Sequence, residues 1–308
     1  MATALTLSLV PIALLIGLGF WLRTTGFIGD DFWPHAERLG YYVLLPALFF
    51  HSLATAELGE LPVRLMISVL VSSTIAVSAI MVMARRLFSV DDPAFTSLFQ
   101  GSVRFNNYVG VSAAAGIFGA QGIAIAAVAN AAIVPTVNIL CVLVFARYGA
   151  GSRATFAGVL RQLIFNPLIM ACALGISVQA SGLAIPPGIE PALKTLGQSS
   201  LPLGLLCIGA ALNLHAVRRW LHPIGVCSIA KFVAMPLATV LICRLFGLQG
   251  EAALAVVMFQ ALPTASSAYI MARQLGGDAP LMAGIIAGQT LIAALALPAV
   301  LLATSHLL

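Results

Sequence analysis

The sequence predicts an all-α integral membrane protein of ten transmembrane helices, arranged as two inverted repeats of five. The first observation is composition: the 308 residues are 61% hydrophobic and 8% charged, whereas a soluble domain carries about 25% charged residues. The second is a series of apolar segments, each about 20 residues long, the length that crosses a bilayer. The third is that two of these segments carry helix-breaking residues near their centres, at matching places in the two halves.

Short polar stretches such as Asp91-Asp92 separate the apolar segments. The predicted spans, in order, are Thr3–Arg23, Trp33–Ala54, Pro62–Arg85, Ala94–Phe118, Gly122–Ala146, Phe156–Ala180, Pro191–Leu212, Leu221–Phe246, Glu251–Leu275 and Pro280–Ser305. No loop is long enough to form a soluble domain. The five cysteines all fall inside apolar segments without CxxC spacing, so we expect them to be packing residues, with no metal site and no cofactor.

Corresponding spans of the two halves carry similar residues in the same order. The pairs are Pro11 with Pro167 in the first spans, Leu45-Pro46 with Leu201-Pro202 in the second, Arg86-Leu87-Phe88 with Arg244-Leu245-Phe246 after the third, Phe99-Gln100 with Phe259-Gln260 in the fourth, and Asn130 with Gln289 in the fifth. Together they predict a repeat, with residues 1–149 as the first copy and 150–308 as the second. Because five spans is an odd number, the second copy must be inverted in the membrane, as in many secondary transporters.

The basic residues between spans predict the orientation, because cytoplasmic loops are enriched in Lys and Arg. One side collects ten of them, Arg23, Arg38, Arg85, Arg86, Arg147, Arg153, Arg161, Arg218, Arg219 and Arg273, and the other collects Arg64, Lys194 and Arg244. The first side should be cytoplasmic. We therefore expect a multi-pass protein of the plasma (inner) membrane with both termini outside.

The fourth and ninth spans contain residues that interrupt helices. The fourth carries Arg104, Asn106 and Asn107 at its centre, and the ninth carries Pro263 and Thr264. Proline removes a backbone donor, and Asn competes for backbone hydrogen bonds. In hydrocarbon, a broken helix persists only where protein or a water-filled cavity covers the freed backbone groups. Two interrupted spans at matching positions indicate a transporter's binding site.

The charges inside the spans favour an anionic substrate. All ten acidic residues fall in loops or at span ends, and the two mid-span charges are the cations Arg104 and Lys231. We interpret Arg104 as a contact for an organic anion, with a structural, carbonyl-bonded arginine as the alternative. Lys231 is interpreted as a supporting charge, which braces the broken helices or responds to ligand charge.

Uncharged polar residues complete the predicted site. Asn106, Asn107, Asn130, Thr264 and Gln289 can hydrogen-bond a carboxylate, and the exposed N-terminal ends of broken helices carry partial positive charge that suits an anion. The alternative interpretation is that these side chains hold helices together. No HExxH, GxSxG or Walker motif occurs, so an enzyme is not expected.

Two motifs resemble the auxin efflux carrier family of membrane transporters, in its prokaryotic branch, which includes proteins assigned as malonate or malate permeases. They are Arg104-Phe105-Asn106-Asn107-Tyr108-Val109-Gly110 in the fourth span and Leu262-Pro263-Thr264-Ala265-Ser266-Ser267-Ala268-Tyr269 in the ninth. In the plant branch a Pro-Asn pair occupies the fourth-span break, and its Asn contacts the substrate carboxylate. Asn107 is the better match to that Asn, although this chain lacks the Pro, and Tyr108 and Pro263 enter the predicted site as members of the motifs.

The resemblance implies a ten-helix, five-plus-five inverted fold in which the fourth and ninth helices cross. It implies a scaffold of the first, second, sixth and seventh spans, usually dimeric, and a mobile transport domain of spans three to five and eight to ten. The long cytoplasmic loop of many plant members is missing, because Arg147 to Arg161 joins the fifth and sixth spans directly.

We therefore expect a secondary transporter for a small organic anion, such as malonate, malate or an auxin-like acid, working by an elevator-type movement. Its expected partners are this substrate, the lipid bilayer and a second copy of the chain, and no nucleic acid. The alternative is a cation-coupled (Na⁺ or H⁺) symporter or antiporter of the same fold, since amide and carbonyl oxygens can also bind sodium. A membrane sensor without transport activity is a further alternative that a flux assay would separate.

Overall fold

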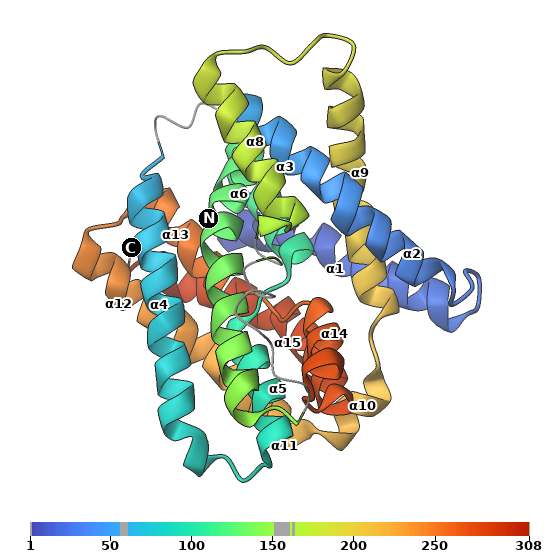
Figure 1. The fold of residues 1–308 in the computed structure, drawn as a ribbon, viewed down its shortest axis with the longest axis vertical. Helices are drawn as coiled ribbons and strands as arrows, with labels where there is room; N and C mark the ends of the chain where they lie inside the picture. The colour runs from blue at the N-terminus through green and yellow to red at the C-terminus, as the bar shows by residue number, and fades with distance from the viewer. Residues whose placement is uncertain (1, 56–60, 151–160, 162–163, 308) are drawn as a thin grey trace. The chain divides into compact units, whose positions relative to one another are not determined.

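The computed structural model describes residues 2–55, 61–150, 161 and 164–307, and all regular secondary structure in these residues is helical (Figure 1). The chain forms two compact units, each with its own internal packing. Unit 1 comprises the described parts of Met1–Leu61, Tyr108–Ala131 and Arg161–Leu212, and unit 2 those of Pro62–Asn107, Ala132–Leu160 and Asn213–Leu308.

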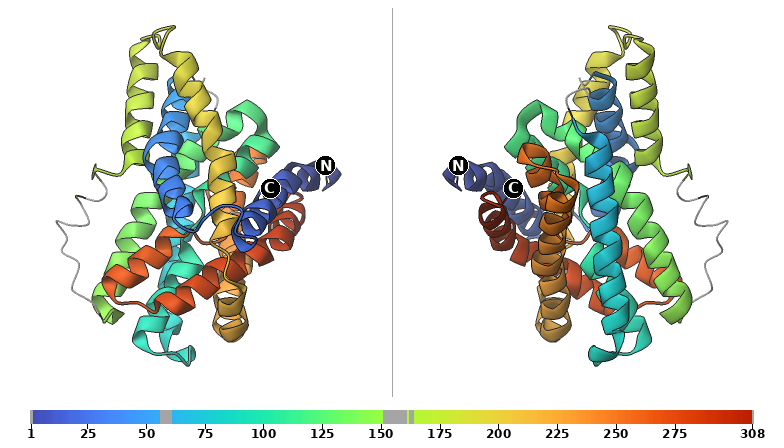
Figure 2. Two further views of the ribbon diagram at one scale, coloured as in Figure 1. Left: turned by 90° about the vertical axis from the view of Figure 1, so that its right-hand side faces the viewer. Right: turned by 90° about the vertical axis from the view of Figure 1, so that its left-hand side faces the viewer.

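Unit 1 is built around the contacts of α3 and α9. Its helices are α1 (Ala2–Thr24), α2 (Phe32–Leu39), η1 (Gly40–Leu44), α3 (Leu45–Thr55), α8 (Pro167–Ser181) and α9 (Glu190–Ala210), together with residues 108–131 of α6. Helix α3 packs beside α8 and α9, and α1 packs along α9 (Figures 1 and 2). The packing pairs helices from opposite ends of the sequence.

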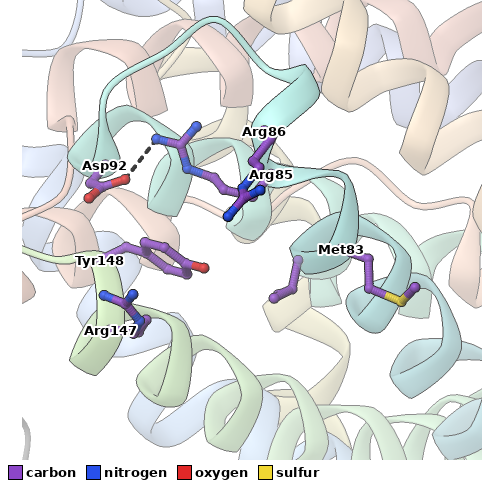
Figure 3. A pocket seen from close by; sticks show the side chains of 7 residues that line it. Met83, Arg85, Arg86, Asp92, Arg147 and Tyr148 are labelled. Atoms are coloured by element: carbon purple, nitrogen blue, oxygen red, sulfur yellow. Dashed lines mark hydrogen bonds and ion pairs between the residues drawn. The ribbon is translucent and has the colours of Figure 1, made fainter.

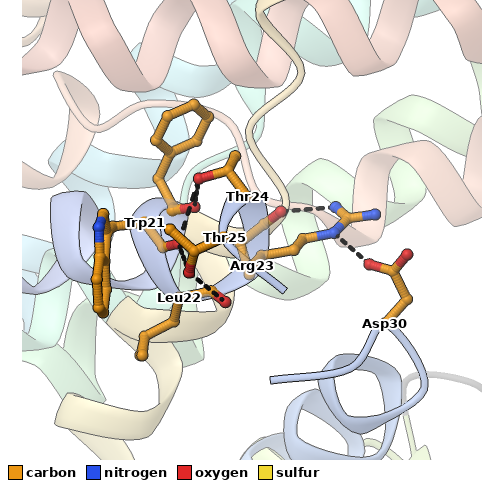
Figure 4. A network of polar contacts seen from close by, with 8 residues as sticks. Trp21, Leu22, Arg23, Thr24, Thr25 and Asp30 are labelled. Carbon is orange, nitrogen blue, oxygen red and sulfur yellow. Dashed lines mark hydrogen bonds and ion pairs between the residues drawn. The ribbon is translucent and has the colours of Figure 1, made fainter. Parts of the chain in front are cut away.

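Glycines let α1 and α9 approach closely. A Cβ atom on Gly19 would overlap the carbonyl of Leu206, and one on Gly209 would overlap the carbonyl of Ile16. Small residues are common where membrane helices meet, because they allow backbone contact. At the end of this contact Arg23 donates to the Ala210 carbonyl at 2.6 Å and pairs with Asp30 at 2.7 Å (Figure 4). Arg23 thus satisfies one of the carbonyls that the end of α9 leaves open.

Unit 2 contains the longest apolar helices. Its elements are α4 (Val63–Met83), η3 (Ala84–Leu87), α5 (Asp92–Val103), α10 (Leu214–Arg219), α11 (Leu221–Ile229), η4 (Ala230–Ala234), α12 (Met235–Phe246), α13 (Gly250–Gln260), α14 (Ser267–Leu275) and α15 (Ala279–Thr304), with the remainder of α6 (Asn107–Tyr148). Helix α4 packs against α12 and α13. Helix α15 packs against α5, α10, α11 and α14, so it lies beside segments from both halves of the sequence.

Local sequence chemistry explains where several helices begin and end. Asp91 caps α5 by accepting from the Ala94 amide at 2.9 Å, and Asp278 caps α15 in the same way through Leu281 at 2.9 Å. Helix α14 ends at Gly276, which adopts the left-handed conformation (φ 76°) that glycine accommodates without strain. Helix α6 turns at Gly119 (φ 61°, ψ −140°), which separates the predicted fourth and fifth spans.

Two helices widen into a π-helical turn, and in each case a proline follows two residues after the turn. Pro46 follows η1, and Pro236 follows η4. Proline has no N–H and its ring crowds the carbonyl of the preceding turn, so a wider turn relieves the mismatch without breaking the helix. The second π turn places Lys231 in the interior of unit 2, as described below.

Among the described residues, four helical stretches are long and apolar enough to cross a membrane: Val63–Leu87, Gln121–Tyr148, Leu221–Phe246 and Ala279–Thr304. Shorter apolar helices cover Leu9–Thr24, Pro167–Ser181 and Gly250–Gln260. The predicted sixth span begins at Phe156, outside the described residues, and its described helix begins at Pro167. The described residues are thus helical wherever they are regular, and their apolar helices are consistent with the predicted membrane protein, while ten spans in an inverted repeat stays a prediction.

Candidate functional site

The first helix interruption lies between α5 and α6. Helix α5 ends at Val103, Arg104 takes an extended conformation (φ −74°, ψ 156°), and α6 begins at Asn107. The Arg104 amide still donates to the Gln100 carbonyl at 2.9 Å, which closes the last turn of α5. The interruption therefore leaves the next carbonyls of α5, including that of Gly101, in need of other donors.

The second interruption lies between α13 and α14, both in unit 2. Helix α13 ends at Gln260 and α14 begins at Ser267, so Pro263 and Thr264 belong to a short non-helical segment. Pro263 is buried and Thr264 is fully buried. A buried non-helical backbone must find hydrogen-bond partners outside its own helix.

Gln289, near the middle of α15, supplies partners to both interruptions. Its Oε1 accepts from the Thr264 amide at 3.1 Å and lies 2.8 Å from the Thr264 hydroxyl. Its Nε2 donates to the Gly101 carbonyl at 2.8 Å. The side chain is fully buried. Both ends of the Gln289 amide are thus engaged by protein groups, and its observed role is to join the two interrupted segments.

Arg104 extends its guanidinium among neutral groups. Nη1 donates to Asn138 Oδ1 at 2.9 Å and lies 3.5 Å from Met271 Sδ, and Nη2 donates to Ser267 Oγ at 3.1 Å. Ser267 is the first residue of α14, where the helix dipole is positive. A cation at this position has no electrostatic support from the helix, and among the described residues no carboxylate pairs with it.

Lys231 is a second buried cation in unit 2. It lies in the π turn η4, which packs against α5 and α15, and its side chain is fully buried. Its Nζ has no hydrogen-bond partner among the residues that the structure describes. An uncompensated buried charge is costly, so unit 2 holds two cationic side chains whose charge the described protein groups leave unbalanced.

The remaining predicted site residues are distributed over both units. Asn106 is buried in unit 2, and the neighbouring Asn107 is half-buried, with an Oδ1 that lacks a partner among the described residues. Tyr108 belongs to unit 1, where its ring packs so closely on Gly204 that a Cβ there would overlap it. Asn130, also in unit 1, donates to the Ala126 carbonyl of its own helix at 2.9 Å. Within unit 2 the structure brings Arg104, Thr264 and Gln289 together.

Two residues beside Arg104 were not predicted as site residues. Asn138 was not singled out, although an amide in the middle of an apolar span is a signal of the same kind as Asn130. The sequence marks Ser267 only as a member of the ninth-span motif, yet its hydroxyl accepts from Arg104. The pairing of Arg104 with Asn138 joins residues 34 positions apart, which the sequence pattern alone does not specify.

Gln100 and Gln260 are two further buried amide side chains of unit 2. Gln260 Nε2 lies 2.8 Å from Ser73 Oγ and 2.9 Å from Thr74 Oγ1, and Gln100 Nε2 lies 3.4 Å from the Ala268 carbonyl. The Oε1 atoms of both glutamines are buried without a partner among the described residues. The sequence marked these residues only as members of the repeated Phe-Gln pair.

Comparison with known proteins identifies the family. A family model described as membrane transport protein matches residues 4–301. A transporter of Methanothermobacter thermautotrophicus, named as uncharacterized, is 26% identical over 302 residues, which cover 95% of this chain and 96% of that protein. A Rhizobium meliloti protein, whose name provisionally assigns it malonate transport, is 26% identical over 249 residues, covering 76% and 75% of the two chains. The chain therefore belongs to the membrane transport protein family, which is the auxin efflux carrier family that its two motifs resemble.

Proposed function

We propose that this membrane transport protein is a secondary carrier for a small organic anion of the malonate or malate class. The observation that carries the proposal is the environment of Arg104, whose guanidinium lies at the N-terminus of α14 among Asn138, Ser267 and Met271. A carboxylate bound there would compensate both the guanidinium and the helix dipole. A guanidinium has five N–H donors, and its three contacts leave donors for a ligand.

The positions of the other candidate site residues agree with an anionic substrate. Asn107 lies at the start of α6, where the helix dipole is also positive, and Lys231 adds a second buried positive charge in unit 2. Thr264 and Gln289 hold the non-helical segments in place. In this proposal Arg104 and Asn107 contact the carboxylate, while Gln289 is a positioning residue. The provisional malonate assignment of the Rhizobium meliloti relative supports the same substrate class.

For the transport cycle we propose an elevator-type movement in which spans three to five and eight to ten move against a dimeric scaffold of spans one, two, six and seven. The two compact units support this proposal in part: the described parts of spans one, two, six and seven lie in unit 1, and those of spans three, eight, nine and ten lie in unit 2, whereas residues 108–131 of spans four and five belong to unit 1. Unit 2 holds both helix interruptions from Arg104 to Asn106 and from Ala261 to Ser266, so these segments can move with one packed body.

The substrate class is tested by thermal unfolding of the purified chain with malonate, malate, indole-3-acetate and, as a cationic probe, choline. A ligand that binds the folded state raises the melting temperature by mass action, with about 2.7 kcal/mol of stabilisation at 100 times its Kd. We expect at least one carboxylate to raise the melting temperature and choline to leave it unchanged. Stabilisation by choline alone would contradict the proposal.

The site is tested with Arg104→Gln, which keeps hydrogen-bonding capacity and removes the charge. A hydrogen bond to a charged group contributes about 1.5–3 kcal/mol, so the affinity for the stabilising carboxylate should fall about 10–100-fold. Arg244→Gln is the matched control, because Arg244 is an arginine of unit 2 whose side chain, among the described residues, bonds the Leu307 carbonyl alone. Equal affinities in the two variants would show that Arg104 does not contact the substrate.

A cation-coupled carrier is the second candidate, and two buried glutamines of unit 2 favour it. The buried Oε1 atoms of Gln100 and Gln260 lack partners among the described residues, and amide oxygens are suitable ligands for a hard cation. Uptake of the identified carboxylate into proteoliposomes, measured with sodium and then with potassium or choline in its place, decides between the candidates. Uptake that requires sodium establishes coupling, whereas equal uptake in all three media excludes sodium coupling.

A further inference from the structure

A basic cavity lies in unit 2, away from the helix interruptions, where two apolar spans end. Its volume is about 470 Å³, and it is lined by residues from the end of α4, from η3, from the start of α5 and from the end of α6 (Figure 3). The spans Val63–Leu87 and Gln121–Tyr148 both end among these residues. The cavity therefore lies at the level where hydrocarbon gives way to lipid headgroups.

One of the three arginines in the cavity is already neutralised and fixed. Arg85 pairs with Asp92 at 2.7 Å, donates to the carbonyls of Phe88 and Val90, and lies over the Phe95 ring, with its Cζ 4.9 Å from the ring centroid. The Arg85–Asp92 pair thus forms a rigid wall of the cavity that carries little net charge (Figure 3).

The other two arginines carry positive charge that the protein leaves uncompensated. Neither Arg86 nor Arg147 has a hydrogen bond or a salt bridge among the residues that the structure describes, and both are exposed. The guanidinium of Arg147 lies 5.2 Å from the ring centroid of Tyr148, and that ring is held edge-on against Phe95 with centroids 5.1 Å apart. Figure 3 shows the Tyr148 ring between the Arg147 and Arg86 side chains.

The border of the cavity is apolar. The side chains of Val82 and Met83, which line the cavity at the end of α4, are 36% and 83% exposed. In a membrane these side chains contact acyl chains. A ligand that uses the whole surface must therefore be anionic at one end and apolar at the other.

We propose that this cavity binds the phosphate headgroup of an anionic phospholipid, with Arg86 and Arg147 contacting the phosphate and Val82 and Met83 contacting the acyl chains. Arginine suits phosphate because its planar donors match the geometry of the phosphate oxygens. Basic pockets between transmembrane helices are sites of this kind. The apolar border distinguishes a lipid from a soluble phosphate ester, which would leave Val82 and Met83 without a contact.

The test is a lipid titration of the full purified chain by native mass spectrometry, with melting temperature as a second readout. The probes are dioleoylphosphatidylglycerol, dioleoylphosphatidylcholine and the soluble ester glycerol 3-phosphate. We expect phosphatidylglycerol to bind and to raise the melting temperature, and the other two probes to have little effect at the same concentration. Equal binding of phosphatidylcholine would overturn the proposal, and so would stabilisation by glycerol 3-phosphate without lipid.

The variant Arg86→Gln/Arg147→Gln should weaken phosphatidylglycerol binding about 10–30-fold, since each basic residue near a membrane surface contributes about fivefold. The control Arg218→Gln/Arg219→Gln removes the same charge, and Arg219 lies over Trp220 at 5.2 Å, as Arg147 lies over Tyr148. If both double variants lose phosphatidylglycerol binding equally, general charge attraction explains the binding, and the assignment of the lipid to this cavity is wrong.

A third double variant, Arg86→Lys/Arg147→Lys, keeps the proposal testable if the glutamine variant does not fold. It retains both charges and should bind phosphatidylglycerol within about fivefold of the unmodified chain, because lysine also binds phosphate as a point charge. Complete loss of binding in a folded lysine variant would overturn the assignment of these two side chains to the phosphate.

Discussion

The side-chain amide of Gln289 donates to the main-chain carbonyl of Gly101 at 2.8 Å, across 188 positions of sequence. Gly101 lies in the last turn of α5, where carbonyls lose their helical partners. The opposite end of the same amide accepts from Thr264 in the second interruption. One side chain of an unbroken helix therefore satisfies backbone groups that two broken helices expose.

We expect Gln289→Met to lower the melting temperature of the substrate-free protein by several degrees. The substitution keeps the side-chain size but leaves the Thr264 amide without this partner, at a cost of about 1–3 kcal/mol. The Gly101 carbonyl loses one of its two donors and keeps the Thr264 hydroxyl at 3.0 Å. The matched control is Thr290→Val, since the neighbouring Thr290 hydroxyl bonds only the Ile286 carbonyl of its own helix. Similar melting temperatures for the two variants would mean that Gln289 does not hold the interruptions together.

Substitutions of Asn107 test whether the first helix interruption binds an anion or a cation. Asn107→Ala should weaken carboxylate binding about 10–100-fold, the effect of losing a hydrogen bond to a charged group. Asn107→Asp should be worse, because it places a negative charge beside the carboxylate. Calorimetric titration of both variants with the identified carboxylate provides the measurement. An aspartate variant that binds the anion as well as the original chain at neutral pH would rule out an anion site at this interruption.

Pro263→Ala should impair transport more than it impairs stability. Alanine restores a backbone donor and allows helix α13 to extend beyond Gln260, which would remove the helix end facing the interruption. The measurement is carboxylate exchange in proteoliposomes together with the melting temperature. Pro298→Ala is the control, because Pro298 lies inside the continuous helix α15. Normal exchange by a well-expressed Pro263→Ala variant would show that this interruption has no part in transport.

The predicted orientation can be tested with single cysteines in a background lacking the five native ones. Ala150→Cys, at the end of α6, should react with a membrane-impermeant maleimide only after permeabilisation, because the charge distribution makes its side cytoplasmic. Gly188→Cys should react in intact cells, since it lies between the predicted sixth and seventh spans and an added side chain meets open space. The reverse labelling pattern would show that the chain has the opposite orientation in the membrane.

The helix interruptions were predictable because their causes are local. Pro263 and the Asn106-Asn107 pair act on the backbone within one helical turn, and the helices stop beside them. The partners of the interrupted segments were not predictable in the same way. Gly101 contributes a backbone carbonyl, which any residue possesses, and its meeting with Gln289 depends on how α5 and α15 pack.

The two π turns have a signal in the sequence, the proline that follows each of them, from which no widened turn was predicted. Pro46 and Pro236 were visible in the sequence, and each follows a π turn by two residues. Whether a proline kinks a helix, ends it or widens it depends on what covers the affected carbonyl, and that covering comes from tertiary packing. The environment of Lys231 therefore became visible only in the folded chain.

The contact between α1 and α9 also bears on the order of events during synthesis. Arg23 and the Ala210 carbonyl that it binds are 187 positions apart. At about 5–20 residues per second, a ribosome needs about 10–40 s to extend the chain from one to the other. During that interval the surface of α1 around Gly19 has no α9 to pack against. The nascent first helix must therefore wait in the membrane, or be held by an insertion factor, until about two thirds of the chain has been translated.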